Sequence, residues 1–121
     1  MAPHTILICE DEVTLRELIR AALGNGYRFA EATDGREALE QLESVQPDLV
    51  ILDVMMPGPS GLEVLAAVRE HAAGRKLPVV VVTAWSHAQD EALAAGAERF
   101  VSKPFDPAEL KAIVEDLLEK P

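Results

Sequence analysis

Short apolar runs recur along the chain and alternate with longer segments of helical periodicity. The runs occupy residues 5–9, 28–32, 49–52, 79–82 and 99–102, and the fourth consists of four successive valines. Strands that are buried on both faces of a parallel sheet are continuously apolar rather than alternating. The pattern therefore predicts five strands of a buried parallel sheet.

Most segments between these runs carry their apolar residues on one helical face, as amphipathic helices that pack on a sheet do. The clearest stripe, near residue 114, consists of Leu110, Ile113, Val114, Leu117 and Leu118. The first segment predicts a buried face made of Leu15, Leu18, Ile19, Ala22 and Leu23. The second predicts one made of Ala38, Leu39 and Leu42.

Capping residues indicate where several of these helices begin and end. Asp106 followed by Pro107 is typical of a helix start, with the acid as N-cap and the proline at the first helical position. Residues 60–63 have the S-x-x-E pattern of a capping box at the start of the third helix. Gly24 and Gly96 stand where the first and fourth helices should end.

The order of elements is strand then helix, repeated five times with short connections. This alternation predicts a parallel sheet with helices on both faces, and right-handed crossovers favour the doubly wound α/β form, a (βα)5 three-layer sandwich. A length of 121 residues matches one domain, so we expect residues 1–121 to form a single unit.

Charge and composition narrow the possible partners. The chain has 11 basic and 21 acidic residues, a formal net charge of −10, which disfavours direct binding to nucleic acid or to an anionic membrane surface. No stretch approaches the roughly 18 apolar residues of a membrane span. Cys9 is the only cysteine, so no internal disulfide can form, and we expect a cytoplasmic location.

Polar residues follow four of the predicted strands. Glu10 and Asp11 follow the first, Asp53 the third, Thr83 the fourth and Lys103 the fifth. In doubly wound sheets, polar chemistry gathers beyond the carboxyl ends of the strands. Clustered carboxylates repel one another unless a cation neutralises them, and oxygen ligands suit Mg²⁺. We therefore expect one divalent cation at this edge of the sheet.

Four motifs carry a family resemblance when they are taken together. They are E-D-E at 10–12, D-V-M-M-P-G at 53–58, V-T-A at 82–84 and K-P-F at 103–105. In this order and at these spacings, the whole chain resembles the receiver (CheY-like) domain of two-component response regulators. The resemblance implies the flavodoxin-like fold with strand order 2-1-3-4-5.

The resemblance also implies a phosphoacceptor and a metal site. Asp53 corresponds to the aspartate that takes a phosphoryl group. Asp11 and Asp53 correspond to direct ligands of Mg²⁺, for which Mn²⁺ is a possible substitute. Glu10 corresponds to the second acid, which acts through water, and Met55 to the residue whose backbone carbonyl completes the set.

Three further residues correspond to the parts that read the phosphoryl group. Lys103 resembles the lysine that pairs with a phosphoryl oxygen, and its bond to Pro104 should be cis. Thr83 resembles the hydroxyl that moves toward the phosphate, and Phe100 the aromatic switch behind it. Met55 and Trp85 flank the path of an attacking water, and because both are large and apolar we expect a long-lived phosphoryl-aspartate.

The implied function is a signalling switch and not an enzyme that turns over a metabolite. The phosphoryl donor would be a sensor histidine kinase or a histidine phosphotransfer protein. The face made of the fourth helix, fifth strand and fifth helix would then control a downstream protein or a fused output domain. We expect a monomer or a weak dimer that depends on phosphorylation.

Three other functions compete with this one. A degenerate receiver would bind a protein partner without phosphorylation. An aspartate-nucleophile phosphohydrolase would need a D-x-D motif after the first strand, which is absent. A nucleotide or flavin carrier would need a phosphate-cradling loop, whereas residues 10–12 are acidic and no P-loop motif exists.

Overall fold

The computed structural model describes residues 3–56, 61–71 and 77–119, and it contains a five-stranded parallel sheet in the order β2-β1-β3-β4-β5. The strands are β1 (Thr5–Cys9), β2 (Arg28–Ala32), β3 (Leu49–Leu52), β4 (Val79–Thr83) and β5 (Arg99–Ser102). The helices are α1 (Val13–Leu23), α2 (Gly35–Val45), α3 (Gly61–His71), α4 (Gln89–Ala94) and α5 (Pro107–Glu119), and a short 3-10 turn, η1 (Ser86–Ala88), precedes α4.

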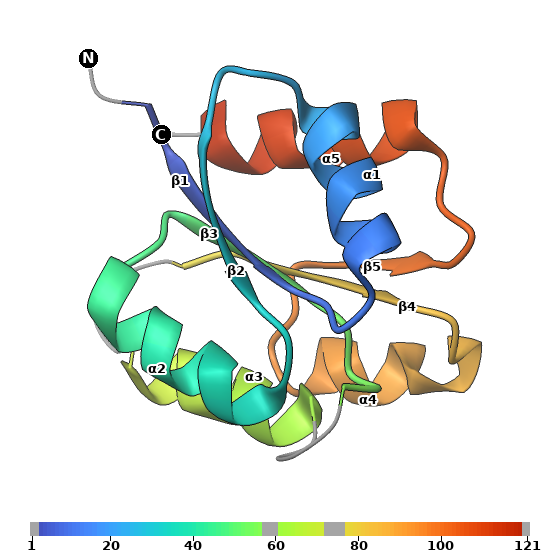
Figure 1. The fold of residues 1–121 in the computed structure, drawn as a ribbon. Helices are drawn as coiled ribbons and strands as arrows, with labels where there is room; N and C mark the ends of the chain where they lie inside the picture. The colour runs from blue at the N-terminus through green and yellow to red at the C-terminus, as the bar shows by residue number, and fades with distance from the viewer. Residues whose placement is uncertain (1–2, 57–60, 72–76, 120–121) are drawn as a thin grey trace.

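The sheet is the middle layer of three. Helices α1 and α5 cover one face, and α2, α3 and α4 cover the other (Figure 1). The doubly wound architecture predicted from the alternation of elements is confirmed, and so is the strand order that the resemblance implied. Strand β4 runs one residue further than its apolar run and includes Thr83.

The core lies in two clusters, one on each face of the sheet. Along β1, Leu7 and Cys9 join the cluster beneath α2, α3 and α4, while Ile6 and Ile8 join the cluster beneath α1 and α5. The valines of β4 divide between the two clusters in the same way. Successive side chains of a strand point to opposite faces, so a strand covered on both faces must be apolar at every position.

The predicted buried face of α1 is wrong at one residue. Ile19 and Leu23 are buried, but Leu18 is 49% exposed. Successive residues of a helix are separated by about 100° around its axis, which places Leu18 on the edge of the stripe that Ile19 centres. The contact between α1 and the core is therefore narrower than the apolar stripe of its sequence.

The helix ends agree with the capping residues. Gly24 ends α1 with φ 83°, a left-handed value that favours glycine, and its N–H donates to Arg20 O at 3.0 Å. Helix α5 begins at Pro107, and Asp106 Oδ1 accepts a hydrogen bond from the N–H of Ala108. The expected capping residue Ser60 lies outside the described residues, and α3 begins at Gly61.

Gly61 allows α3 to begin directly against the segment that follows β3. A Cβ at this position would lie 2.1 Å from Val54 Cα, so only glycine fits without a shift of the backbone. The Gly61 N–H also donates to Val54 O at 3.3 Å. Val54 directly follows Asp53, so this contact anchors the backbone next to a predicted site residue against the start of α3.

The lengths of the helices show whether any of them could span a membrane. Of the helices in the described parts of the chain, none has both the length and the apolar content needed to cross a bilayer.

Candidate functional site

The backbone holds Asp53 and Glu10 side by side at the carboxyl ends of β3 and β1. The two strands are neighbours, and the Asp53 N–H donates to Cys9 O at 2.9 Å, one step beyond the last strand pair. The Glu10 N–H donates to Ala32 O at 2.9 Å in the same way. Both carboxylates are almost fully buried, with Glu10 2% and Asp53 5% exposed.

Lys103 joins these two acids. Its Nζ donates to Glu10 Oε1 at 2.6 Å and to Asp53 Oδ2 at 2.8 Å. The Lys103–Pro104 peptide bond is cis, as expected. The Lys103 N–H donates to Thr83 O, which ties the residue to the end of β4. Glu10 and Asp53 thus share the ammonium group of Lys103, although they lie 93 and 50 positions before it in the sequence.

The pKa values of Glu10 and Lys103 are both raised, but for different physical reasons. Burial raises the pKa of Glu10 to about 7, and the charge of Asp53 adds to this, although hydrogen bonds from Lys103 and from the Glu12 N–H oppose it. Burial alone would lower the pKa of Lys103, but its hydrogen bonds to Asp53 and Glu10 raise it. Lys103 therefore stays protonated and positively charged. The charged form of Glu10 is disfavoured by burial, and a further cation nearby would stabilise it.

The carboxylates form a set that fits a hard divalent cation. Glu10, Asp11 and Asp53 each offer one oxygen, and these oxygens lie within 4.8 Å of one another. Glu10 and Asp53 are buried, whereas Asp11 is exposed, so the set is open to solvent on one side. Three carboxylates and one ammonium leave a formal excess of negative charge. All-oxygen ligation with room for water suits Mg²⁺ or Mn²⁺.

Met55 lies beside this set. Its backbone N–H donates to Asp53 Oδ1 at 2.9 Å, so each oxygen of the Asp53 carboxylate has a donor. The Met55 side chain is 58% exposed, whereas that of Met56 is buried in the core. The turn expected at Pro57 and Gly58 lies outside the described residues.

The two predicted switch residues lie on neighbouring strands, Thr83 in β4 and Phe100 in β5. Thr83 is fully buried at the end of β4, and its Oγ1 accepts a hydrogen bond from the Trp85 N–H at 3.3 Å. Phe100 lies in β5 opposite Val81 and packs, half-buried, against the cluster beneath α2, α3 and α4. The structure therefore brings Glu10, Asp11, Asp53 and Lys103 together, with Thr83 next to Lys103 and Phe100 within the neighbouring core.

Sequence reasoning missed Arg16. This residue of α1 donates from Nη1 to the backbone oxygen of Glu10 at 2.8 Å and from Nε to Glu31 Oε1 at 2.9 Å. The available signal was a basic residue one turn into the helix that follows the acids at 10–12. Periodicity alone could not show that its side chain returns to the end of β1.

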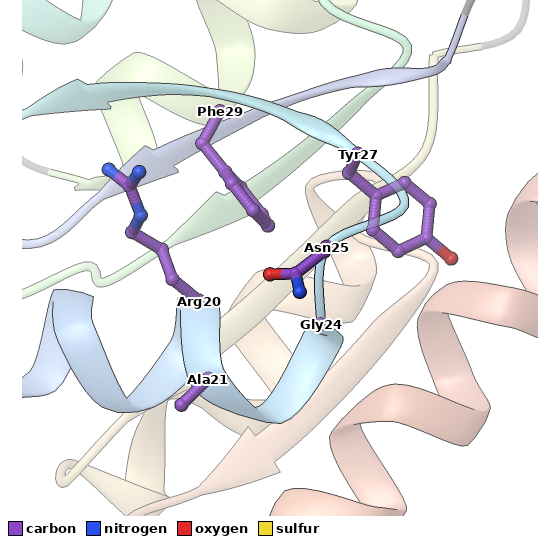
Figure 2. A pocket seen from close by; sticks show the side chains of 6 residues that line it. All are labelled: Arg20, Ala21, Gly24, Asn25, Tyr27 and Phe29. Atoms are coloured by element: carbon purple, nitrogen blue, oxygen red, sulfur yellow. The ribbon is translucent and has the colours of Figure 1, made fainter.

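A cavity of about 310 Å³ lies elsewhere, between the C-terminal end of α1 and the start of β2. Figure 2 shows its lining residues, which are Arg20, Ala21, Gly24, Asn25, Tyr27 and Phe29. The Arg20 guanidinium lies over the Phe29 ring at 5.2 Å from its centroid. No carboxylate is among the lining residues, and the cavity opens at the amino end of the sheet, away from the acids.

The last turns of α5 reach the same end of the sheet. Burial raises the pKa of Tyr27, and the charges of Glu115 and Glu119 raise it further. The C-terminal part of α5 therefore lies near the start of β2 and away from the carboxyl end of β3, the strand that Asp53 follows (Figure 1).

Comparison with curated proteins agrees with this geometry. The family model for the response regulator receiver domain matches residues 6–115. The phosphate regulon transcriptional regulatory protein PhoB of Klebsiella pneumoniae is 38% identical over 118 residues, and the response regulator MprA of Mycolicibacterium vanbaalenii is 42% identical over 121 residues. The alignments cover 95% and 98% of this chain but 52% of each relative. The chain thus spans about half the length of these curated relatives.

Solved structures show the same likeness. A putative response regulator from Chloroflexus aurantiacus has a TM-score of 0.89 at 37% identity, covering 98% of this chain and 99% of that one. The receiver domain of NtrX from Brucella abortus has a TM-score of 0.86 at 30% identity, covering 96% and 99%. On the family match, the identities and the fold together, this chain belongs to the family of response regulator receiver domains.

Proposed function

We propose that Asp53 accepts a phosphoryl group from a phosphohistidine of a sensor histidine kinase or a histidine phosphotransfer protein, in a reaction that depends on Mg²⁺. The observation that carries this proposal is the arrangement around Asp53. Its buried carboxylate is held by Lys103 Nζ and by the Met55 N–H, and the carboxylates of Glu10 and Asp11 lie beside it.

The chemistry is a single phosphoryl transfer. A carboxylate oxygen of Asp53 forms a bond to phosphorus, the bond between phosphorus and the imidazole nitrogen breaks, and its electron pair stays on the imidazole, which takes up a proton. Such transfers ask a protein mainly for alignment and charge neutralisation. The end of β3 and the two donors hold the nucleophile still, and Lys103 supplies a positive charge for a phosphoryl oxygen.

The residues that would hold Mg²⁺ are Glu10, Asp11, Asp53 and the backbone carbonyl of Met55. When bound, the ion supplies the positive charge that offsets the phosphoryl oxygens and the clustered acids. The donor set supports this assignment, because hard oxygen ligands converge in one place and one of them, Asp11, is exposed to solvent.

Phosphorylation would then act as a switch. It adds about −1.5 to −2 charge units beside Lys103 and Thr83, so the donors at the ends of β4 and β5 must rearrange. Thr83 and Phe100 are the residues proposed to carry this change to the face formed by α4, β5 and α5. In this role the domain catalyses its own phosphorylation and loss of the phosphoryl group, and no metabolite is turned over.

The output of the switch is proposed to be a downstream protein or a fused output domain. Relatives such as PhoB are transcriptional regulatory proteins about twice the length of this chain, which supports a fused domain. A cytoplasmic location and a monomer, or a weak dimer that depends on phosphorylation, are parts of the same proposal.

Mass spectrometry of the intact protein tests the proposal. Incubation with acetyl phosphate and MgCl₂ should add one phosphoryl group to the wild type and none to Asp53→Asn, and chelation of the metal with EDTA should abolish the addition. A Glu40→Gln variant, changed at an exposed site on α2, should behave like the wild type. A wild type that takes up no phosphoryl group would instead support the degenerate receiver.

A further inference from the structure

Arg16 links helix α1 to the backbone that carries the acids. Its side chain is 13% exposed, and it donates to two acceptors from different parts of the fold. Nη1 donates to Glu10 O at 2.8 Å, and Nε donates to Glu31 Oε1 on β2 at 2.9 Å. Arg16 therefore joins α1, β2 and the end of β1.

The orientation of the Glu10 carbonyl depends on its hydrogen bond from Arg16. Glu10 lies one residue beyond β1, where its N–H still pairs with Ala32 O but the strand pairings of β1 have ended at Cys9. The oxygen that Arg16 binds belongs to the peptide unit that joins Glu10 to Asp11. Because a peptide unit is planar, holding its oxygen fixes the plane that contains the Asp11 N and Cα atoms, and so the point from which the Asp11 side chain extends.

The other half of Arg16 is held in place. Glu31 accepts from Arg16 through Oε1 and from Arg20 through Oε2, the latter at 2.5 Å. The guanidinium group is planar, with its donors in a fixed fork, so the bond from Nε to Glu31 determines where Nη1 points. Glu31 thereby orients Arg16, and Arg16 orients the Glu10 carbonyl.

We propose that Arg16 is a positioning residue for the cation site, which fixes the Glu10–Asp11 peptide and so directs both carboxylates toward the ion without touching it. The inference rests on the proposed Mg²⁺ dependence of the domain. Groups that orient metal ligands from behind commonly change metal affinity by about 10- to 100-fold when they are removed.

Charge and positioning predict opposite effects, which makes the inference testable. Arg16 is a cation close to a cation site, so if it acted only through its charge, its removal would tighten Mg²⁺ binding. If it acts by positioning, its removal must weaken binding in spite of that change. Arg20 provides the matched comparison, because it also lies on α1 and pairs with Glu31 but, within the described part of the chain, donates no hydrogen bond to Glu10.

The experiment is a titration of the metal-free protein with MgCl₂, followed by the amide chemical shifts of Asp53 and Met55 and by the fluorescence of Trp85. The dissociation constant of Arg16→Gln should rise about tenfold. That of Arg20→Gln should stay within about twofold of the wild type or fall. Arg16→Lys keeps the charge but loses the planar fork, so its dissociation constant should also rise.

Each other outcome would overturn the inference in a recognisable way. Equal weakening in Arg16→Gln and Arg20→Gln would assign the effect to Glu31, and tighter binding by Arg16→Gln would assign it to charge. Wild-type binding by Arg16→Lys would show that the planar fork of Arg16 does not position the site. Circular dichroism shows whether Arg16→Gln is folded, and if it is not, Arg16→Lys decides the question. A wild type that shows no response to MgCl₂ would contradict the proposed function itself.

Discussion

Lys103 contributes more to the site than the sequence indicated. The resemblance assigned it to a phosphoryl oxygen, but in the structure it already bridges Glu10 and Asp53. Two buried carboxylates at this separation need such a partner, because an unpaired buried charge is strongly unfavourable. The same ammonium that stabilises the unphosphorylated site is therefore available to a phosphoryl group on Asp53.

Met55 and Trp85 are the residues for which a kinetic effect is expected. Their side chains are 58% and 42% exposed, at positions two residues after Asp53 and Thr83. Neither offers a strong hydrogen-bond acceptor that could orient a water molecule for attack on phosphorus, whereas Asn and Glu do. We expect Met55→Asn and Trp85→Glu each to shorten the lifetime of the phosphoryl-aspartate, by about tenfold.

The lifetime is measured by the loss of the phosphoryl mass after the donor has been removed. Met55→Leu keeps an apolar side chain of similar volume and serves as the control, so its lifetime should match the wild type. If neither polar variant loses the phosphoryl group faster than the wild type, exclusion of water by these side chains is not what sets the lifetime.

At the scale of elements, the start of α3 constrains the segment after Asp53. Gly61→Ala would place a Cβ 2.1 Å from Val54 Cα, so either α3 or that segment must move. We expect a loss of about 1–3 kcal/mol in the free energy of unfolding, measured with urea, together with slower phosphorylation by acetyl phosphate. Gly26→Ala, where the added Cβ would meet nothing within 4 Å, is the matched control and should change neither quantity.

The pairing between α1 and β2 predicts a dependence of stability on pH. Burial would raise the pKa of Glu31, but the hydrogen bonds and charges of Arg20 and Arg16 outweigh it and hold the pKa below its usual 4.5. The native state then binds a proton less readily than the unfolded state, so the contribution of Glu31 is present above about pH 4.5 and is lost as the pH falls through its native value.

Urea unfolding between pH 7 and pH 3 measures this contribution. The wild type should lose more stability than Glu31→Gln as the pH falls below about 4.5. Glu40→Gln, which removes the exposed partner of Arg36 at 3.8 Å, should follow the wild type closely. Identical pH profiles for the wild type and Glu31→Gln would show that the two arginines do not stabilise the charged form of Glu31.

The sequence could predict the features that local patterns determine, but not those that depend on how one element packs against another. Apolar runs located the strands, and because the carboxyl ends of parallel strands meet, the polar residues after them had to converge, as Asp53 and Lys103 do. The prediction that Leu18 is buried was wrong, and Arg16 was missed, for the same reason. The rotation of α1 against the sheet decides which of its side chains is buried and which reaches Glu10, and local periodicity does not specify that rotation.

At the scale of the whole molecule, the two faces of the sheet are linked through its central strands. Residues of β1 and β4 alternate between the two core clusters, so a displacement of one strand is felt by the helices on both sides. Close packing transmits such displacements, because a protein interior has little free volume to absorb them. A rearrangement at Thr83 or Lys103 can therefore reach α4 and α5 without unfolding either helix.

The position of the end of α5 has a consequence for any polypeptide attached beyond it. Glu119 lies near Tyr27, at the rim of the sheet opposite Asp53, and the five residues of β1 separate the two rims by roughly 17 Å. This exceeds the Debye length of about 8 Å at physiological ionic strength, so a negative charge added to Asp53, as proposed, is largely screened at that distance on any path through solvent. A tethered neighbour would therefore have to sense mechanical displacement of the intervening elements, and raising the salt concentration should leave its response largely intact.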